Sequence, residues 1–231
     1  MSENGGKVLV VTGASSGIGT ATARAAAERG WRLALAARSQ DKLEAIVDEL
    51  GEDRAFSIRC DVTDFEDQVA MVEAVVERFG RIDAVLANAG VGGEPGGFSG
   101  APVESWRRMV DTNILGVAFT LRASLGAVKQ SAGHVLLTGS VAGRRTLAGS
   151  MYSATKWAVS AIGYGLRDEL KGTGVRVTII EPGMVDTPFF DEPKPGVLEA
   201  EDIARSIVYA LSQPAHVDVH ELMVLPTPPR E

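Results

Sequence analysis

Short apolar segments alternate with helix-like segments along the first half of the chain. Residues 7–12 form a β-branched run with few polar positions, which indicates a strand buried on both faces. Further strands are expected at 32–37, 55–59 and 82–86, and helical periodicity follows each of the first three strands. Because no repeat or linker interrupts this alternation, it predicts a doubly wound parallel sheet with right-handed crossovers.

The second half of the chain continues the alternation. It predicts helices over 103–130, 152–171 and 201–211, and strands over 134–138, 175–180 and 217–225. The chain has 231 residues, of which 45% are hydrophobic, and this is enough for one substantial core. We therefore expect a single α/β domain over residues 1–231.

A glycine-rich turn joins the first strand to the first helix. Its glycines follow a G-x-x-x-G-x-G spacing, in which they let the backbone turn sharply and approach a pyrophosphate, while the helix start offers free N–H groups. The spacing differs from G-x-G-x-x-G, and the turn could be no more than a tight connection. The strand before it and the helix after it favour phosphate binding. The candidate residues are Gly13, Ser15, Ser16, Gly17, Ile18 and Gly19.

The second strand ends where many dinucleotide sites carry an acidic residue that binds the ribose 2′-hydroxyl. Here that position is Ala37, and Arg38 and Ser39 follow it. A guanidinium can hold a 2′-phosphate through charge-assisted hydrogen bonds of about 1.5 to 3 kcal/mol. The sequence therefore predicts NADP(H) rather than NAD(H), with a solvated loop arginine as the alternative interpretation.

Three later strand ends supply further candidate cofactor contacts. Asp61 is placed either to accept a hydrogen bond from an adenine amino group or, with Thr63 or Asp64, to cap the next helix. Small residues near 88–90 would let the backbone lie close to the cofactor, and residues after the strand 175–180 could bind the nicotinamide carboxamide. The candidates are Asp61, Val62, Asn88, Ala89, Gly90, Pro182, Gly183, Val185 and Thr187.

Tyr152 and Lys156 are four residues apart in an expected helix and therefore share one face. An ammonium close to a phenol stabilises the phenolate, so Lys156 is expected to lower the pKa of Tyr152 and make it a usable acid–base group. Ser140, at a strand end, could donate a hydrogen bond to a substrate carbonyl oxygen. The competing interpretation is a packing tyrosine with a solvated hydroxyl.

Seven short motifs occur in order along the chain. They are the glycine turn 12–19, Asp61-Val62, Asn88-Ala-Gly90, Asn113, Ser140, Tyr152-x-x-x-Lys156, and Pro182-Gly183 with Thr187. In order and approximate spacing they resemble the short-chain dehydrogenase/reductase family over nearly the whole chain. The resemblance implies a Rossmann-like fold with a seven-stranded parallel sheet and a catalytic tetrad of Asn113, Ser140, Tyr152 and Lys156.

The resemblance also implies roles and an assembly. Lys156 would bind the nicotinamide ribose, and Asn113 would hold a water of the proton relay. Homodimers or homotetramers would form through the helices 103–130 and 152–171. The Ala37-Arg38 pair resembles the NADP-preferring branch, and the carboxyl-terminal sequence resembles enzymes that oxidise hydroxy acids such as serine, and related aldehyde reductases. Ser140 precedes Tyr152 by twelve residues, one fewer than is usual in the family, so we expect a shorter loop with the hydroxyl geometry retained.

Two loops are candidates for the substrate side. The glycine-rich residues 92–102 are expected to be mainly a connection, with the rim of the site as the alternative. Residues 188–200 are expected to form a lid, apolar at Phe189 and Phe190 and stiffened by prolines. Each aromatic is as well explained by packing on the core. Such a lid predicts a modest pocket for a small alcohol or carbonyl compound.

Charge, cysteine content and the absence of long apolar runs argue against a nucleic-acid-binding, metal-binding, membrane or secreted protein. The net charge of −7 and pI near 5.1 give no electrostatic footprint for nucleic acid. The single cysteine, Cys60, is expected to be a buried thiol, and the histidines lack metal-ligand spacing, so no metal is expected. No apolar run reaches the length of a membrane span, and residues 1–7 do not have the pattern of a signal peptide, so a cytoplasmic protein is expected.

These observations predict an NADP(H)-dependent oxidoreductase that transfers hydride between nicotinamide and a small alcohol, ketone or aldehyde. One alternative is a cofactor-binding sensor or scaffold without useful catalysis, although such a protein has no need of a tyrosine–lysine pair. Another is an epimerase or dehydratase on the same fold, which usually has a longer carboxyl-terminal substrate domain.

Overall fold

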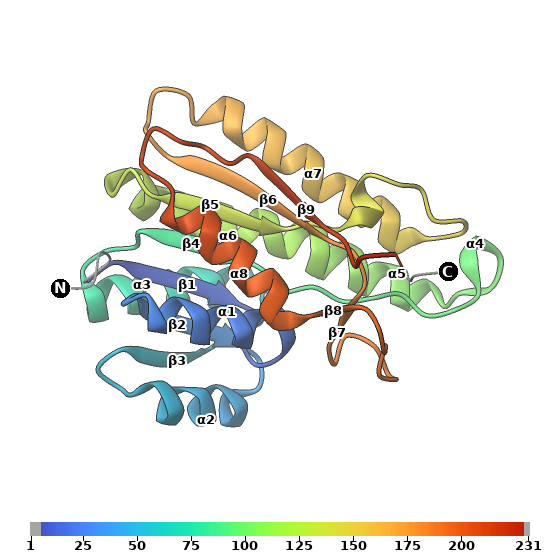
Figure 1. Ribbon diagram of the computed structural model, residues 1–231, viewed down its shortest axis with the longest axis horizontal. Helices are drawn as coiled ribbons and strands as arrows, with labels where there is room; N and C mark the ends of the chain where they lie inside the picture. The colour runs from blue at the N-terminus through green and yellow to red at the C-terminus, as the bar shows by residue number, and fades with distance from the viewer. Residues whose placement is uncertain (1–5, 229–231) are drawn as a thin grey trace.

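A seven-stranded parallel sheet forms the centre of the molecule (Figure 1). Its order is β3-β2-β1-β4-β5-β6-β9, and every neighbouring pair is parallel. The strands are β1 (Val8–Thr12), β2 (Arg32–Ala37), β3 (Ala55–Arg59), β4 (Ala84–Ala87), β5 (His134–Thr138), β6 (Arg176–Pro182) and β9 (Glu221–Val224). The predicted doubly wound α/β domain is confirmed.

Helices cover both faces of the sheet because successive strand residues point to opposite sides. Leu9 and Val11 pack in one core cluster with residues of α1, α2 and α8, whereas Val8 and Val10 pack in a second cluster with residues of α3, α6 and α7. The helices are α1 (Gly17–Glu28), α2 (Gln40–Leu50), α3 (Phe65–Phe79), α4 (Gly97–Gly100), α5 (Val103–Val110), α6 (Gly116–Gln130), α7 (Met151–Glu169) and α8 (Ala200–Ser212).

The computed structural model describes residues 6–228, so the expectation for the amino-terminal segment 1–7 lies mostly outside the described residues. Within 6–228, no helix is both long enough and apolar enough to cross a membrane.

The last strand is shorter than predicted. It begins at Glu221 rather than at 217, because the preceding residues form a turn in which Val217 N–H donates to the Pro214 carbonyl oxygen at 2.8 Å. The carboxylate of Asp218, rather than a backbone carbonyl, then accepts from Val177 N–H at 3.1 Å.

The predicted helix 103–130 is interrupted. Residues Asp111–Leu115 form a π-helical turn, η1, between α5 and α6, in which Gly116 N–H donates to the carbonyl of Asp111. Such turns are frequent at functional sites. Here the turn contains Asn113, one of the residues that the family resemblance places in the tetrad.

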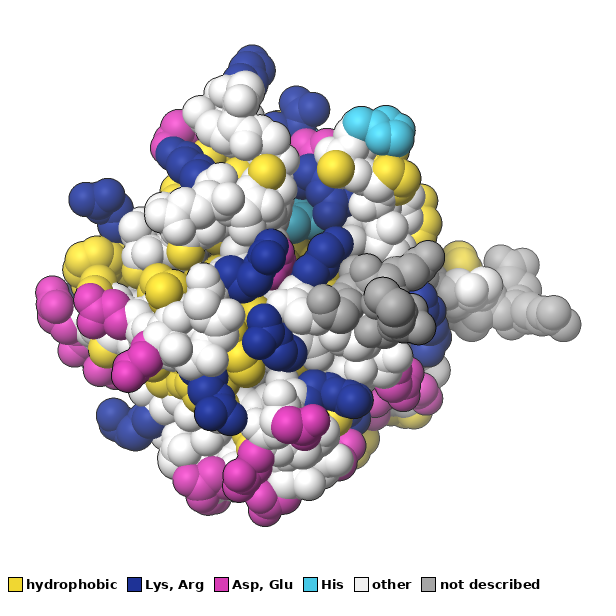
Figure 2. All heavy atoms as spheres, turned by 90° about the vertical axis from the view of Figure 1, so that its left-hand side faces the viewer, with side chains coloured by type: hydrophobic (Ala, Val, Ile, Leu, Met, Phe, Trp, Pro, Cys, Tyr) yellow, Lys and Arg dark blue, Asp and Glu magenta, His cyan; other side chains and the backbone are white. Residues whose placement is uncertain are grey.

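The chain leaves β1 for β2 and β3 on one side and later adds β4, β5 and β6 on the other, so β1 and β4 flank the point where the strand order reverses. In open α/β sheets, ligands bind at the carboxyl ends of the strands beside this point. Figure 2 shows the opposite end, where Lys and Arg side chains gather. At the amino ends of the strands, Arg176, the first residue of β6, donates to three backbone carbonyls.

Candidate active site

A cleft of about 1120 Å³ opens at the carboxyl ends of the strands. It is lined by nearly all the residues predicted from the sequence: Gly13, Ser15, Ser16, Gly17, Ile18, Arg38, Ser39, Asp61, Val62, Asn88, Ala89, Gly90, Ser140, Tyr152, Lys156, Pro182, Gly183, Val185 and Thr187. Gly19 and Asn113 lie behind its wall. Segments that are far apart in sequence thus form one continuous site.

The glycine turn has the properties that a bound pyrophosphate needs. Ser16 is the N-cap of α1, but its side chain makes no capping hydrogen bond within the described part of the chain, so first-turn N–H groups remain available. A Cβ on Gly19 would lie 2.3 Å from the Gly13 carbonyl oxygen, and one on Gly17, where φ is +52°, would lie 3.1 Å from Thr187 Cβ. The turn therefore requires glycine at both positions, and its donor set fits a dinucleotide.

Asn88 holds the glycine turn in place. Its side-chain amide donates to the carbonyls of Thr12 and Gly13, at 3.0 and 3.3 Å, and its Oδ1 accepts from the Thr138 hydroxyl at 3.2 Å. The Thr12 hydroxyl accepts from Asn88 N–H at 3.0 Å. Asn88 thus connects the ends of β1, β4 and β5. Thr12 and Thr138 were not singled out for these roles from the sequence.

Arg38 is exposed at the rim of the cleft and forms no hydrogen bond or ion pair with another described residue. Asp61 lines the cleft nearby. Burial alone would raise the pKa of Asp61, but hydrogen bonds from Thr63 and the charge of Arg38 lower it. The N-cap of α3 is Asp64, which accepts from the N–H groups of Glu66 and Asp67. The Asp61 carboxylate is therefore not the helix cap.

Tyr152, Ser140 and Lys156 meet beside the glycine turn. Ser140 follows β5 and lies close enough to the Tyr152 hydroxyl to lower its pKa, and its Oγ accepts from Ala142 N–H at 3.1 Å. Lys156 lies in α7, with its Nζ 5.7 Å from the centre of the Tyr152 ring. Its ammonium donates to the Thr138 carbonyl at 2.7 Å. The loop that is one residue shorter than usual keeps Ser140 at the tyrosine hydroxyl.

The protonation of this group differs from the sequence prediction. Burial raises the pKa of Tyr152 to about 12, against a smaller lowering by the Ser140 hydrogen bond. Burial also lowers the pKa of Lys156 to about 8. The predicted lowering of the pKa of Tyr152 by Lys156 is wrong, because burial of both groups disfavours both charged forms. Tyr152 therefore keeps its proton through neutral pH.

Asn113 is fully buried behind the cleft, where its side chain makes three hydrogen bonds. Its Oδ1 accepts from Val91 N–H at 2.8 Å, and its Nδ2 donates to the Val91 carbonyl at 2.9 Å and to the Thr155 hydroxyl at 3.1 Å. A Cβ added to Gly90 would lie 3.4 Å from Asn113 Oδ1 and 3.7 Å from Lys156 Nζ. Asn113 and Lys156 thus approach each other at this glycine.

The competing serines near Tyr152 have other roles. Ser150 is the N-cap of α7 and accepts from Ser153 N–H at 3.1 Å. Ser153 is buried and donates to the Ala142 carbonyl at 2.6 Å. Ser140 is therefore the serine that pairs with the tyrosine hydroxyl.

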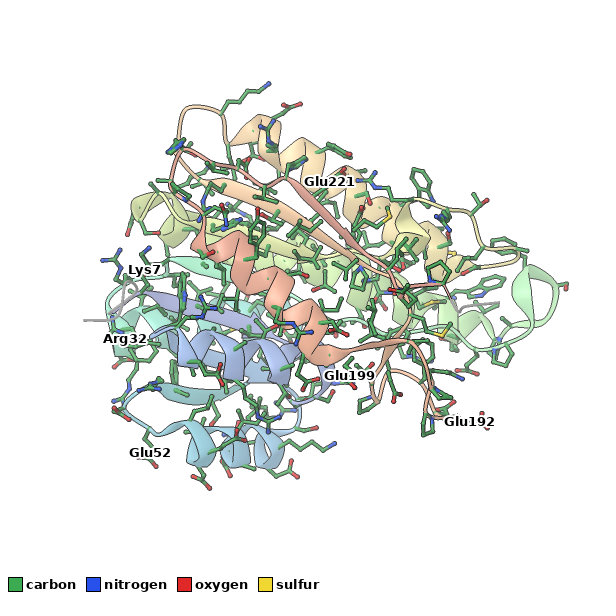
Figure 3. All side chains as sticks on the ribbon, viewed as in Figure 1. Lys7, Arg32, Glu52, Glu192, Glu199 and Glu221 are labelled. Atoms are coloured by element: carbon green, nitrogen blue, oxygen red, sulfur yellow. The ribbon has the colours of Figure 1, made fainter. Side chains whose placement is uncertain are left out.

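A buried ion pair supports the turn that follows Ser140. This turn is η2 (Val141–Gly143), and Arg144 directly after it places its Nε 2.6 Å from Oε1 of the buried Glu181 in β6. Arg144 also pairs with Glu221 of β9, which is labelled in Figure 3. The sequence did not predict this pair, because no local pattern relates residues so far apart in the chain.

The substrate side of the cleft is formed by the glycine-rich loop 92–102 and by residues of the predicted lid 188–200. Residues 92–97 and Ala101 line the cleft, so the glycine-rich loop is part of the rim rather than only a connection. Two short strands, β7 (Val185–Asp186) and β8 (Leu198–Glu199), pair in parallel and hold the ends of segment 187–197. Phe189 and Phe190 of this segment also line the cleft, and the Phe189 ring centre is 5.6 Å from that of Tyr152. The loop is shorter than the lid predicted over 188–200, because Leu198–Glu199 form β8 and Ala200 begins α8, and we refer to residues 187–197 as the lid segment.

Cys60 lies at the end of β3, buried at the wall of the cleft, as the sequence predicted. Burial raises the pKa of its thiol to about 12. It is therefore a neutral thiol and a poor nucleophile.

Comparison with known proteins identifies the family. The sequence pattern of the short chain dehydrogenases matches residues 7–196. An uncharacterized oxidoreductase of Staphylococcus haemolyticus is 43% identical over 98% of this chain and all of its own length. The solved structure of an alcohol dehydrogenase from the archaeon Thermococcus sibiricus, complexed with 5-hydroxy-NADP, is 36% identical, with a TM-score of 0.89 over 97% of this chain and 99% of its own.

A serine dehydrogenase complexed with NADP+ is 31% identical, with a TM-score of 0.88 over 95% of this chain and 94% of its own. Other similar structures hold NADH or NAD. The order of the strands, the glycine turn at the start of α1 and these relatives lead to one conclusion. The chain belongs to the short-chain dehydrogenase/reductase family of oxidoreductases.

Proposed function

We propose that this protein uses NADP(H) to reduce the carbonyl group of a small aldehyde or ketone to an alcohol, in a reversible reaction. The observation that carries the proposal is the single cleft that contains both the glycine turn and the contact of Ser140 with Tyr152. Homodimers or homotetramers, formed through α6 and α7, are part of the same proposal.

The chain's own groups suit each part of the cofactor. The glycine turn and the first N–H groups of α1 would hold the pyrophosphate, and Arg38 with Ser39 would hold the 2′-phosphate. Asp61 and Val62 would flank the adenine. Val185 and Thr187 would hold the carboxamide, and Lys156 the adjoining ribose. The bound nicotinamide would supply the hydride to the carbonyl carbon.

The proton would come from Tyr152. The Ser140 and Tyr152 hydroxyls would donate hydrogen bonds to the carbonyl oxygen, and as hydride adds to the carbon the phenolic proton would move to the oxygen, giving the alcohol. Burial keeps Tyr152 protonated at neutral pH, so the phenolic proton is present when the carbonyl compound binds. The Lys156 ammonium would stabilise the phenolate that remains, and Asn113 would support the water relay that restores the proton.

Loss of NADPH absorbance with a panel of small aldehydes and keto esters tests the proposal. We expect turnover that depends on both protein and carbonyl compound. Tight NADPH binding without turnover of any compound would instead indicate the sensor or scaffold alternative. Conversion of substrate without net NADPH oxidation would indicate an epimerase or dehydratase.

Arg38→Ala tests the assignment of the cofactor. Since the guanidinium is exposed and forms no hydrogen bond or ion pair with another described residue, its loss should raise the Kd for NADPH about 10- to 100-fold and leave the Kd for NADH nearly unchanged. The matched control is Arg78→Ala, which removes an exposed arginine of α3 outside both the cleft and the helices of the proposed interface and should change neither value. Fluorescence titration of both cofactors measures this. A wild-type preference for NADH would overturn the assignment.

A further inference from the structure

The substrate end of the cleft carries exposed apolar side chains. Leu147, Met184 and Phe189 are 50%, 47% and 41% exposed, although large apolar side chains are usually buried. They come from three separate segments: the loop after η2, the turn between β6 and β7, and the lid segment. All three line the same cleft. Apolar groups that converge on a cleft in this way indicate a ligand with an apolar surface.

Phe189 is the apolar group nearest to the proposed chemistry. Its ring packs on Tyr152, with an angle of 59° between the rings, and its centre is 5.2 Å from that of Phe190. On the opposite side, a Cβ added to Gly92 would lie 3.1 Å from Phe189 Cζ. The ring thus reaches from the lid segment to the glycine-rich rim. This ring is therefore an apolar surface beside Tyr152 against which a substituent of a carbonyl compound can pack.

Cations at this end of the cleft are scarce. Among the described residues that line the cleft, the cationic ones are Arg38, Lys156 and Lys194. Arg38 follows β2, at the proposed 2′-phosphate position, and Lys156 donates to the carbonyl of Thr138 at the end of β5. This leaves Lys194 as the cation available to a substrate carboxylate.

Lys194 shares the lid segment with groups that oppose such a role. Its ammonium lies 5.5 Å from the centre of the Phe190 ring. Asp191 and Glu192 in the same lid segment are exposed and also line the cleft, and Figure 3 shows Glu192 at the outer end of this segment. The three side chains give the segment an excess of negative charge. This charge disfavours an anion at the mouth of the cleft.

We propose that the substrate of this site is an uncharged aldehyde or ketone whose apolar substituent packs against Phe189, and that hydroxy or keto acids carrying a carboxylate are poor substrates. The proposal rests on the proposed function and selects among the substrate classes that it leaves open. It separates this chain from an enzyme specific for serine.

Matched pairs of carbonyl compounds that differ in charge test the proposal. We would measure kcat/KM with NADPH for methyl 3-oxobutanoate against 3-oxobutanoate, and for benzaldehyde against 4-formylbenzoate. The uncharged member of each pair should have a kcat/KM about 10- to 100-fold higher, because a carboxylate would be desolvated without a dedicated partner. Oxidation of serine with NADP+ should be slow by comparison.

Two variants, with one control, test which residues of the lid segment determine the substrate preference. Phe189→Ala should raise KM for benzaldehyde about tenfold, with a smaller change in kcat and in the Kd for NADPH, because it removes apolar contact area. Val76→Ala, at an exposed apolar position of α3 outside the cleft, is the control and should change none of these values. Lys194→Gln should leave the ratio between uncharged and charged compounds unchanged.

The outcomes distinguish the inference from the proposed function. Equal or faster turnover of the carboxylates would overturn the inference while leaving carbonyl reduction intact. If Lys194→Gln then lost this turnover selectively, Lys194 would be identified as the group that binds the carboxylate. An unchanged benzaldehyde KM in Phe189→Ala would also overturn the role of the ring. Binding of NADPH with no turnover of any compound would overturn the proposed function itself, and the inference with it.

Discussion

Replacing Tyr152 with phenylalanine lowers kcat for carbonyl reduction about 10²- to 10⁴-fold, the range typical for loss of a general acid. The hydroxyl is the only part of the side chain that is removed, so the ring keeps its contact with Phe189. The Kd for NADPH should stay within about twofold, because the pyrophosphate and 2′-phosphate positions are unchanged. Stopped-flow kinetics and fluorescence titration measure the two quantities.

Tyr209→Phe is the matched control for this prediction. Tyr209 lies on α8, is 53% exposed and does not line the cleft, so loss of its hydroxyl should leave kcat unchanged. Normal turnover in Tyr152→Phe would end the proposed proton transfer. A comparable loss in both variants would show that the effect is not specific to the site.

Gly19→Ala should abolish tight cofactor binding. The added Cβ would lie 2.3 Å from the Gly13 carbonyl oxygen and 2.9 Å from Ala14 Cα. Because these are backbone atoms, the glycine turn must move, at a cost of about 1–3 kcal/mol in the free energy of unfolding. We expect the Kd for NADPH to rise by about 100-fold or more, since a shift of about 1 Å removes several N–H groups from the pyrophosphate.

Gly126→Ala makes the same substitution in α6, where a Cβ meets nothing within 4 Å. It should raise the free energy of unfolding by about 0.5–1 kcal/mol, because alanine loses less backbone entropy in a helix, and it should leave the Kd for NADPH unchanged. Thermal denaturation and cofactor titration of both variants measure this. Tight NADPH binding by Gly19→Ala would contradict the proposed position of the pyrophosphate.

The sequence was most informative where local chemistry determines local structure. The apolar runs identified the five inner strands of the central sheet, because these strands are buried by helices on both faces, and the strands expected at 55–59 and 217–225 correspond to the partly exposed edge strands β3 and β9. The glycine turn, Arg38 and the pair Tyr152 and Lys156 were found because their spacing has a direct physical meaning. The structure then placed the turn, the arginine and the pair in one cleft.

Other features depend on contacts between distant residues and have no local signal. The π-helical turn around Asn113 is held by Val91 and by Thr155 of α7. The pairing of β7 with β8, which holds the lid segment, involves strands of two residues each. The pKa of Tyr152 follows from burial, which is set by the packing of the whole site rather than by the lysine one turn away.

Deuterium transfer tests hydride transfer by this chain most directly. The purified protein is incubated with benzaldehyde and with NADPH in which both hydrogens at C4 of the nicotinamide are replaced by deuterium, and the alcohol is analysed by mass spectrometry. The account predicts one deuterium on the carbinol carbon in the wild type and almost no labelled alcohol with Tyr152→Phe. Alcohol formed without deuterium, or no alcohol from any uncharged aldehyde or ketone, would contradict it.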